Sequence, residues 1–196
     1  MNDVHIRAAL KRKLLFQYKD DRETVVIEEL GVHHGTSRID LAVVNGVLHG
    51  FELKSDQDTL TRLPEQANAY GAVFDRVTLV VGERHLCRAA DIVPDWWGIR
   101  VVRGKPNSLL FSDLKLPMEN PSPDPFSVVS LLWRNEALSF LEELGGASGL
   151  RSRSRAEIYV ALVERAGFSC LRDRVRRCLR DRREWRSAGK RLSCGD

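Results

Sequence analysis

The chain has 196 residues, of which 43% are apolar and 30% charged, values typical of one soluble domain, or of one domain with a helical appendage. No stretch approaches the roughly 18 apolar residues that a membrane span needs, and no charged-then-apolar leader opens the chain. We therefore expect neither secretion nor membrane insertion. Four cysteines without a CxxC pair suit a reducing compartment, so the expected location is cytoplasmic.

The formal charge of +4 is unevenly distributed along the sequence. Segment 151–196 holds 14 Arg and Lys against 6 Asp and Glu, a balance of +8, which leaves −4 for residues 1–150. A basic tail on an acidic body is typical of a protein with a polyanionic partner. The alternative is an arginine-rich helical face whose charges are simply solvated.

The first 116 residues predict a mixed β-sheet flanked by helices. Apolar residues at helical spacing predict a helix over 4–18, with Lys and Arg on its outer face. Strands are expected over 24–30, 38–44, 47–54, 77–81 and 99–102, and further helical segments over 64–72 and 84–91. Asn45-Gly46 lies between two of these strands and is a strong hairpin signal. The expected fold class is therefore α/β.

Four prolines between positions 117 and 125 mark the best domain boundary. The predicted organisation is a core over 1–116, a proline-rich linker over 117–125 and a basic helical extension over 126–196. Within this C-terminal all-helical extension, helices are expected over 127–144, 155–166 and 171–185.

Three charged side chains interrupt the apolar strands of the hairpin: Asp40, Glu52 and Lys54. Residues two apart in a strand share a face, so Glu52 and Lys54 project together, and antiparallel pairing brings Asp40 near Glu52. Paired carboxylates offer the hard oxygen ligands that Mg²⁺ or Mn²⁺ prefers. Such a metal lowers the pKa of a bound water, which a neighbouring lysine can position. The pattern predicts phosphodiester hydrolysis.

This arrangement depends on the length of the hairpin loop. A strict two-residue loop at Asn45-Gly46 would pair Val44 with Val47, and Asp40 and Glu52 would then point to opposite faces. A three-residue loop or one β-bulge restores a shared face. We therefore predict a bulge or a wider turn at this point.

These residues resemble the core motif of the PD-(D/E)XK nuclease superfamily, in which an Asp on one strand precedes (Asp/Glu)-x-Lys on the next. Here the motif reads Asp40 and Glu52-Leu53-Lys54, with Ile39 in place of the proline of the name. Gln66-Ala-Asn-Ala-Tyr70 is similar to the QxxxY element of RecB-like members. Glu29 resembles the additional acidic ligand that many members carry, although on a strand rather than a helix.

The resemblance covers roughly residues 20–105 and narrows to an uncharacterised bacterial family with an Arg-rich helical tail, here Leu132-Trp-Arg-Asn-Glu136 and Arg174-Val-Arg-Arg-Cys-Leu-Arg180. It implies a restriction-endonuclease-like fold and metal-dependent cleavage of DNA, with RNA as an alternative substrate. A duplex-cutting member of this class would favour a homodimer.

The resemblance also implies roles for individual residues. Asp40 and Glu52 would bind Mg²⁺ or Mn²⁺, with the Leu53 carbonyl and Glu29 completing the ligand set, while Lys54 would position the attacking water. Gln66 and Tyr70 would orient the substrate strand or the lysine; a cap and a packing aromatic are equally good interpretations of that pair. The expected nucleic-acid contacts are Arg38, Arg62, Arg174 and Arg177.

Two other classes of function remain open at this point. The first is a nucleic-acid-binding protein that keeps the fold without turnover. The second is an interaction module whose helical tail binds a protein partner and whose arginines are solvated.

Overall fold

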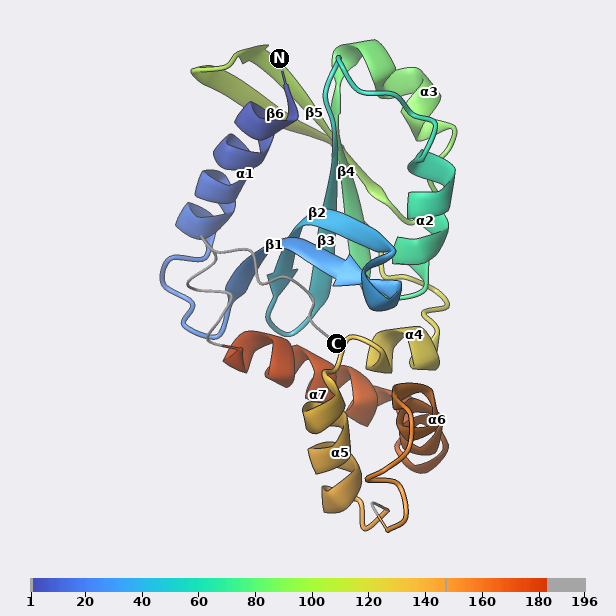
Figure 1. The fold of residues 1–196 in the computed structure, drawn as a ribbon. Coiled ribbons are helices and arrows are strands. Elements are labelled where there is room, and N and C mark those ends of the chain that lie inside the picture. Colours follow the sequence, from blue (N-terminus) through green and yellow to red (C-terminus); the bar gives the residue numbers. More distant parts are fainter. Residues whose placement is uncertain (1, 147, 183–196) are drawn as a thin grey trace.

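A computed structural model describes residues 2–146 and 148–182, and its centre is one six-stranded sheet (Figure 1). The strands lie side by side in chain order: β1 (Val25–Val32), β2 (Ser37–Val44), β3 (Leu48–Lys54), β4 (Arg76–Gly82), β5 (Gly98–Lys105) and β6 (Ser108–Lys115). The β3–β4 and β4–β5 pairs are parallel and the others antiparallel. The expected mixed α/β sheet is confirmed.

Parallel neighbours require a crossover between them, and short helices supply both. Helix α2 (Leu63–Gly71) joins β3 to β4, and a 3₁₀ turn, η2 (Glu83–His85), with α3 (Leu86–Ala90) joins β4 to β5. A second 3₁₀ turn, η1 (His33–Gly35), joins β1 to β2. These connections leave the carboxyl end of β3 and the start of α2 next to each other in the chain.

The β2–β3 hairpin has the wider turn that the sequence predicts. Val44 pairs with Leu48, so residues 45–47 form a three-residue loop. The Asn45 side chain accepts a hydrogen bond from the Val47 N–H at 3.0 Å, and the Asn45 N–H donates to the Val47 carbonyl at 3.1 Å. If the β2–β3 register is extended by one pair beyond Leu41–Phe51, Asp40 lies opposite Glu52.

The two faces of the sheet carry different layers. Helix α1 (Asp3–Gln17) covers one face and buries Ile6, Leu10 and Leu14 against β2–β5. The other face packs against α2, α3 and the C-terminal helices (Figure 1). The helical period of the first segment therefore correctly identified its apolar stripe.

Strand β6 lies outside the predicted elements, because the sequence ends the last strand at residue 102. Its residues, Ser-Leu-Leu-Phe-Ser-Asp-Leu-Lys, include no β-branched side chain, and such side chains are the strongest local indication of a strand. Pairing with β5 forms β6 nonetheless, with a register shift at Ile99/Arg100.

The C-terminal region is helical, as expected: α4 (Pro125–Val129), α5 (Arg134–Glu143), α6 (Arg155–Arg165) and α7 (Phe168–Asp181). The single helix expected over 127–144 is wrong, because Trp133 is extended (φ −69°, ψ 156°) and begins α5 anew. The Glu136 side chain accepts from the Trp133 N–H at 2.7 Å and fixes that start. The end of the helix expected over 171–185 lies outside the described residues.

The proline-rich segment before α4 is anchored to the body by hydrogen bonds. The Asn120 amide donates to two carbonyls at the end of α2 and just after it, at 2.6 and 2.8 Å. Backbone N–H groups of Met118 and Asp124 donate to other body carbonyls at 2.9 Å each. One apolar cluster runs from the sheet through α4 to α7. No helix in the described ranges is long and apolar enough to cross a bilayer.

Candidate active site

A cavity of about 470 Å³ lies where the start of α1, the β1–β2 region, the end of β3 and the start of α2 meet. Its lining includes six acidic side chains, Asp3, Glu29, Asp40, Glu52, Asp58 and Glu65, and four basic ones, Arg7, Arg38, Lys54 and Arg62. Leu53 and Gln66 also line it. The formal charge of this lining is −6 + 4 = −2, which favours a cation.

Glu52 lies at the centre of one half of the site and is 1% exposed. Its Oε1 accepts from Lys54 Nζ at 2.7 Å and from Gln66 Nε2 at 2.6 Å, and its Oε2 accepts from Tyr70 Oη at 2.9 Å. Burial raises the pKa of Glu52, while Lys54 and the two other donors oppose that rise. The structure thus brings together four residues that the sequence singled out.

Tyr70 and Gln66 lie one turn apart on α2 and face β3. The Tyr70 hydroxyl lies 2.7 Å from the Arg38 carbonyl and 2.9 Å from Glu52, so its single proton has two acceptors. Burial, and then the charge of Glu52, raise the pKa of Tyr70, which keeps the hydroxyl a neutral donor. The ring also stacks on Trp97, with ring centroids 6.2 Å apart. Tyr70 is therefore both a packing aromatic and a polar contact to the site.

Asp40 forms the other half of the site with different partners. Its Oδ2 accepts from the Leu53 N–H at 2.8 Å, and its Oδ1 accepts from Arg7 Nη2 at 2.9 Å. The β2–β3 ladder ends at the pair Leu41–Phe51 and does not reach Asp40. The Asp40 side chain, rather than the β2 backbone, accepts from the Leu53 N–H. Burial, and then the charge of Glu52, raise the pKa of Asp40 to about 7, against the opposing Leu53 N–H.

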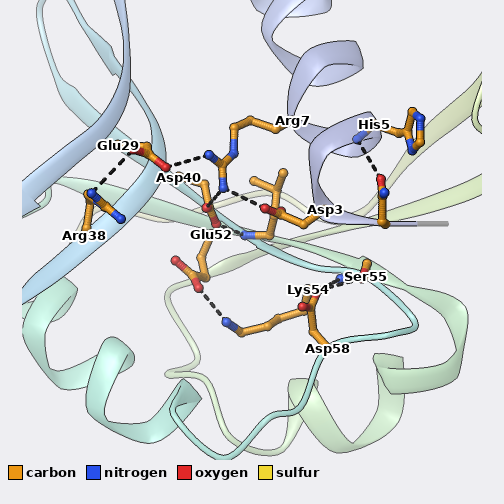
Figure 2. Close-up of polar contacts among 12 residues, drawn as sticks. Asp3, His5, Arg7, Glu29, Arg38, Asp40, Glu52, Lys54, Ser55 and Asp58 are labelled. Atoms are coloured by element: carbon orange, nitrogen blue, oxygen red, sulfur yellow. Dashed lines mark hydrogen bonds and ion pairs between the residues drawn. The ribbon is translucent and has the colours of Figure 1, made fainter. Parts of the chain in front are cut away.

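Glu29 lies opposite Asp40, between two regular β1–β2 pairs, and its φ is +53°. A positive φ is uncommon in residues other than glycine and is found preferentially at functional sites. The Glu29 carboxylate accepts from Arg7 Nη1 at 2.8 Å and lies 3.5 Å from Arg38 Nη1 (Figure 2). The backbone conformation and the ion pairs place Glu29 at the cavity.

Two further residues, Asp3 and Arg7, come from α1 and were not identified as site residues from the sequence. Arg7 was expected on the outer face, but its side chain is only 23% exposed and lies 2.6 Å from Asp3. Burial acts against the charged guanidinium, yet Asp40 and Asp3 outweigh it and raise the pKa of Arg7. The available signal was the i, i+4 spacing of opposite charges at a helix start.

The four arginines expected to contact nucleic acid lie in two places. Arg38 and Arg62 line the cavity, and Arg62 has no ion pair among the described residues. Arg174 and Arg177 line a separate hollow between α5 and α7. Arg174 is paired with Glu143, whereas Arg177 is exposed.

Most arginines of α7 and its end are engaged within the molecule. Their partners are Asp75 and Glu119 for Arg172, Glu143 for Arg174, Asp75 and Asp173 for Arg176, Glu23 for Arg180 and Glu136 for Arg182. Asp75 also accepts from the Leu48 N–H at the start of β3. Glu52 lies four residues further along β3, about 13 Å away at strand spacing. Helix α7 therefore contacts the end of the strand remote from the cavity.

The cavity has oxygen atoms that suit a hard divalent cation. Among the described residues no three His, Cys, Asp or Glu side chains are arranged to hold a metal ion, but Mg²⁺ is commonly held by one or two carboxylates plus waters. Asp40 and Glu52 provide two carboxylates. In addition, Asp3 Oδ1 and Gln66 Oε1 are buried without a hydrogen-bond partner within the described chain. In ligand type and charge, these residues fit such an ion.

The fold and the site define a mixed α/β protein with a net-negative cavity, at which the carboxylates of Asp40 and Glu52 meet Lys54. The family model described as bacteriophage P4 protein cII matches residues 1–189, and the chain belongs to that family. Protein cII of Enterobacteria phage P4 is 27% identical over 123 residues, which are 63% of this chain and 47% of that protein. The chain thus spans about half the length of this curated relative.

Two solved structures show limited similarity to this chain. An SPO1766 protein of unknown function from Silicibacter pomeroyi gives a TM-score of 0.41 at 17% identity, over 70% of this chain and 90% of that one. SfsA from Pyrococcus furiosus, in complex with Ca²⁺, gives 0.35 at 13% identity, over 60% and 65%. Neither similarity is close enough to bear on the function of this chain.

Proposed function

We propose that the protein is a metal-dependent nuclease that hydrolyses phosphodiester bonds in DNA, and that it is a member of the PD-(D/E)XK superfamily. The observation that carries the proposal is the meeting of Asp40 and Glu52 at one net-negative cavity, with Lys54 Nζ 2.7 Å from Glu52. Mg²⁺ or Mn²⁺ would be held by Asp40 and Glu52, together with the Leu53 carbonyl. Glu29, which is paired with Arg7 and Arg38, would complete the ligand set only after its side chain leaves those partners. When bound, the ion would polarise a phosphoryl oxygen and lower the pKa of a coordinated water.

Lys54 would position the attacking water and offset the charge that develops on the phosphate. Lys54 is 6% exposed and its ammonium group is hydrogen-bonded to Glu52, which fixes its place in the cavity. Gln66 and Tyr70 would hold the Glu52 carboxylate in position and so affect the substrate indirectly, because both donate a hydrogen bond to that carboxylate.

Arg38 and Arg62 would contact the phosphates that flank the scissile bond, because both line the cavity and Arg38 is 62% exposed. We place the activity in the cytoplasm, consistent with the cysteine pattern. Cleavage of both strands of a duplex would favour two copies of the site, so a homodimer is part of the proposal.

A nucleic-acid-binding protein without turnover, acting on DNA or RNA, is the second candidate. It is favoured by the fact that both oxygens of Glu52 and both of Asp40 already have protein partners. Part of the coordinating capacity of both carboxylates is therefore already used, and a cation would compete with these donors.

The test is a cleavage panel with plasmid, linear duplex, single-stranded DNA and RNA, each with Mg²⁺, Mn²⁺ or EDTA. Asp40→Asn and Lys54→Met should each lower the cleavage rate by about 10²-fold or more. Asp113→Asn, an exposed acidic residue outside the cavity, is the matched control and should cut at the parental rate. Binding without metal-dependent cleavage by the parent would favour the second candidate. Undiminished cleavage by both cavity variants would refute the proposed site.

A further inference from the structure

A single guanidinium group contacts three carboxylates at the edge of the cavity. Arg7 Nη1 donates to Glu29 at 2.8 Å, and Arg7 Nη2 donates to Asp3 at 2.6 Å and to Asp40 at 2.9 Å. Figure 2 shows these contacts converging from α1, β1 and β2 on one side chain. We call Asp3, Glu29 and Asp40 the acidic cradle.

The acidic cradle is not fully satisfied by Arg7. Three acidic side chains share one guanidinium group. Among the described residues the second arginine at this edge, Arg38, forms an ion pair with Glu29 alone, at 3.5 Å. Asp3 Oδ1 and Arg7 Nε are both buried without a hydrogen-bond partner in the described part of the chain. Buried polar atoms without partners are costly. A second cation could bind the free Asp3 oxygen, whereas the Arg7 N–H is a donor that a cation does not satisfy.

We infer that Arg7 is a tethered counter-cation that occupies the cation position at Asp40 in the metal-free protein and competes with a divalent ion for that carboxylate. The inference rests on the proposed function, because it needs a metal at Asp40. Arg7 keeps Asp40 in place before metal binds. When metal binds, Arg7 releases Asp40 Oδ1 and keeps Asp3, which lies on its own helix.

Arg38 provides a matched control for this competition. It carries the same charge, lines the same cavity and pairs with the same Glu29, but no contact joins it to Asp40. A general electrostatic effect on metal binding would therefore be similar for Arg7→Met and Arg38→Met. Direct competition at Asp40 would be specific to Arg7→Met.

The experiment measures Mn²⁺ and Ca²⁺ binding to the full chain by titration calorimetry, and metal-induced stabilisation by thermal melting. We expect Arg7→Met to bind Mn²⁺ about tenfold more tightly than the parent, because the ion no longer has to compete with the charged hydrogen bond from Arg7 to Asp40. Arg38→Met removes only the 3.5 Å ion pair to Glu29 and no contact to Asp40, so it should raise the affinity by less than Arg7→Met does. Metal-free Arg7→Met should melt below the parent and regain more stability on adding metal.

Arg7→Lys is a second variant, in case Arg7→Met folds poorly. It keeps the charge, but an ammonium group lacks the planar fork that bridges several carboxylates, so its affinity should lie between those of parent and Arg7→Met. Equal Mn²⁺ affinity in the parent, Arg7→Met and Arg7→Lys would overturn the inference and leave the metal site standing. Failure of the parent and of every variant to bind either metal would overturn the proposed function, and the inference with it.

Discussion

Asp75 and Arg176 are 101 positions apart in the chain, yet the carboxylate of one lies 2.7 Å from the guanidinium of the other. Asp75 is 4% exposed, and it also contacts Arg172 at 2.6 Å and accepts from the Leu48 N–H at 2.6 Å. One buried carboxylate thus joins the start of β3 to two successive turns of α7. This contact holds the helical region on the sheet at the end remote from the cavity.

Replacing Asp75 by alanine should therefore destabilise the whole molecule. The change removes the buried acceptor of the Leu48 N–H and of two largely buried guanidinium groups, which keep only the exposed Glu119 and Asp173 as partners. Breaking a buried ion pair costs about 3–5 kcal/mol. Urea denaturation followed by circular dichroism would measure the loss of free energy of unfolding. Asp113→Ala is the control: it removes a 40% exposed partner of Arg100 and should cost less than about 1 kcal/mol. Similar losses in the two variants would contradict this account of Asp75.

Tyr70→Phe should separate the packing and polar roles of this residue. The ring remains, but Glu52 and the Arg38 carbonyl lose the hydroxyl donor, so we expect a loss of about 1 kcal/mol in the free energy of unfolding. Cleavage under the proposed function should fall by about tenfold, because the rotamer of Glu52 is then held by Lys54 and Gln66 alone. Full activity at reduced stability would show that Tyr70 only packs.

Asp40 should make the metal-free protein less stable as the pH rises towards neutrality. Its pKa of about 7 in the folded protein exceeds an ordinary value near 4 in the unfolded chain. Between about pH 4 and about pH 7 the folded state binds more protons, so the free energy of unfolding falls as pH rises and levels off above about pH 7. Urea unfolding in EDTA across this range should show a flatter dependence for Asp40→Asn. Unchanged slopes would contradict the raised pKa.

His49 should act in the opposite direction. Burial, and then the charges of Arg76 and Arg100, lower the pKa of His49 to about 3, against about 6.5 in the unfolded chain. Below about pH 6.5 the unfolded state therefore binds a proton that the folded state does not. The contribution of His49 to the free energy of unfolding decreases as the pH falls from about 6.5 to about 3. His49→Gln should keep a polar contact to Thr78 and remove this acid sensitivity. Parent and variant would be compared by urea unfolding between about pH 4 and about pH 7, and parallel curves would argue against the shift.

The salt dependence of nucleic-acid binding would locate the substrate surface. Arg38→Ala and Arg62→Ala should each reduce the slope of log K against log salt by about one unit, the value for one phosphate contact. Arg174→Ala should change it less, because that guanidinium pairs with Glu143. Fluorescence anisotropy with a labelled duplex would measure the slopes. A larger change in Arg174→Ala or Arg177→Ala would favour the basic tail as the binding surface.

The parts of the site that are local in sequence could be predicted. Strand alternation places Glu52 and Lys54 on one face, and helix geometry places Gln66 one turn from Tyr70. The requirement for a shared face predicts a bulge or a wider turn, and the structure has the wider turn. Each of these depends on neighbours within a few positions, where the geometry of strands, helices and turns is nearly fixed. The mixed sheet followed from the same local signals.

The parts that depend on tertiary packing could not be predicted. Helical periodicity identifies the buried face of α1, but it does not show which strand ends lie beside the first turn of the helix. The sequence therefore predicts that the Arg7 side chain is exposed. Likewise, the arginines of α7 have a clear helical phase, whereas their acidic partners lie up to 157 positions away. The positive φ of Glu29 follows from its place in the sheet rather than from its residue type.

The conformation of Glu29 has a consequence for association between molecules. Strand β1 is one edge of the sheet, and an open edge can accept a strand from another chain. A left-handed residue in mid-strand, with charged side chains at positions 28 and 29, interrupts the row of N–H and C=O groups that an incoming strand would need. The opposite edge, β6, contains no left-handed residue and exposes Leu110 and Leu114, and its one irregularity is the register shift near its end, at Leu114. The regular stretch of β6 before that shift is therefore the edge better suited to accept another strand, on the side of the sheet opposite β1.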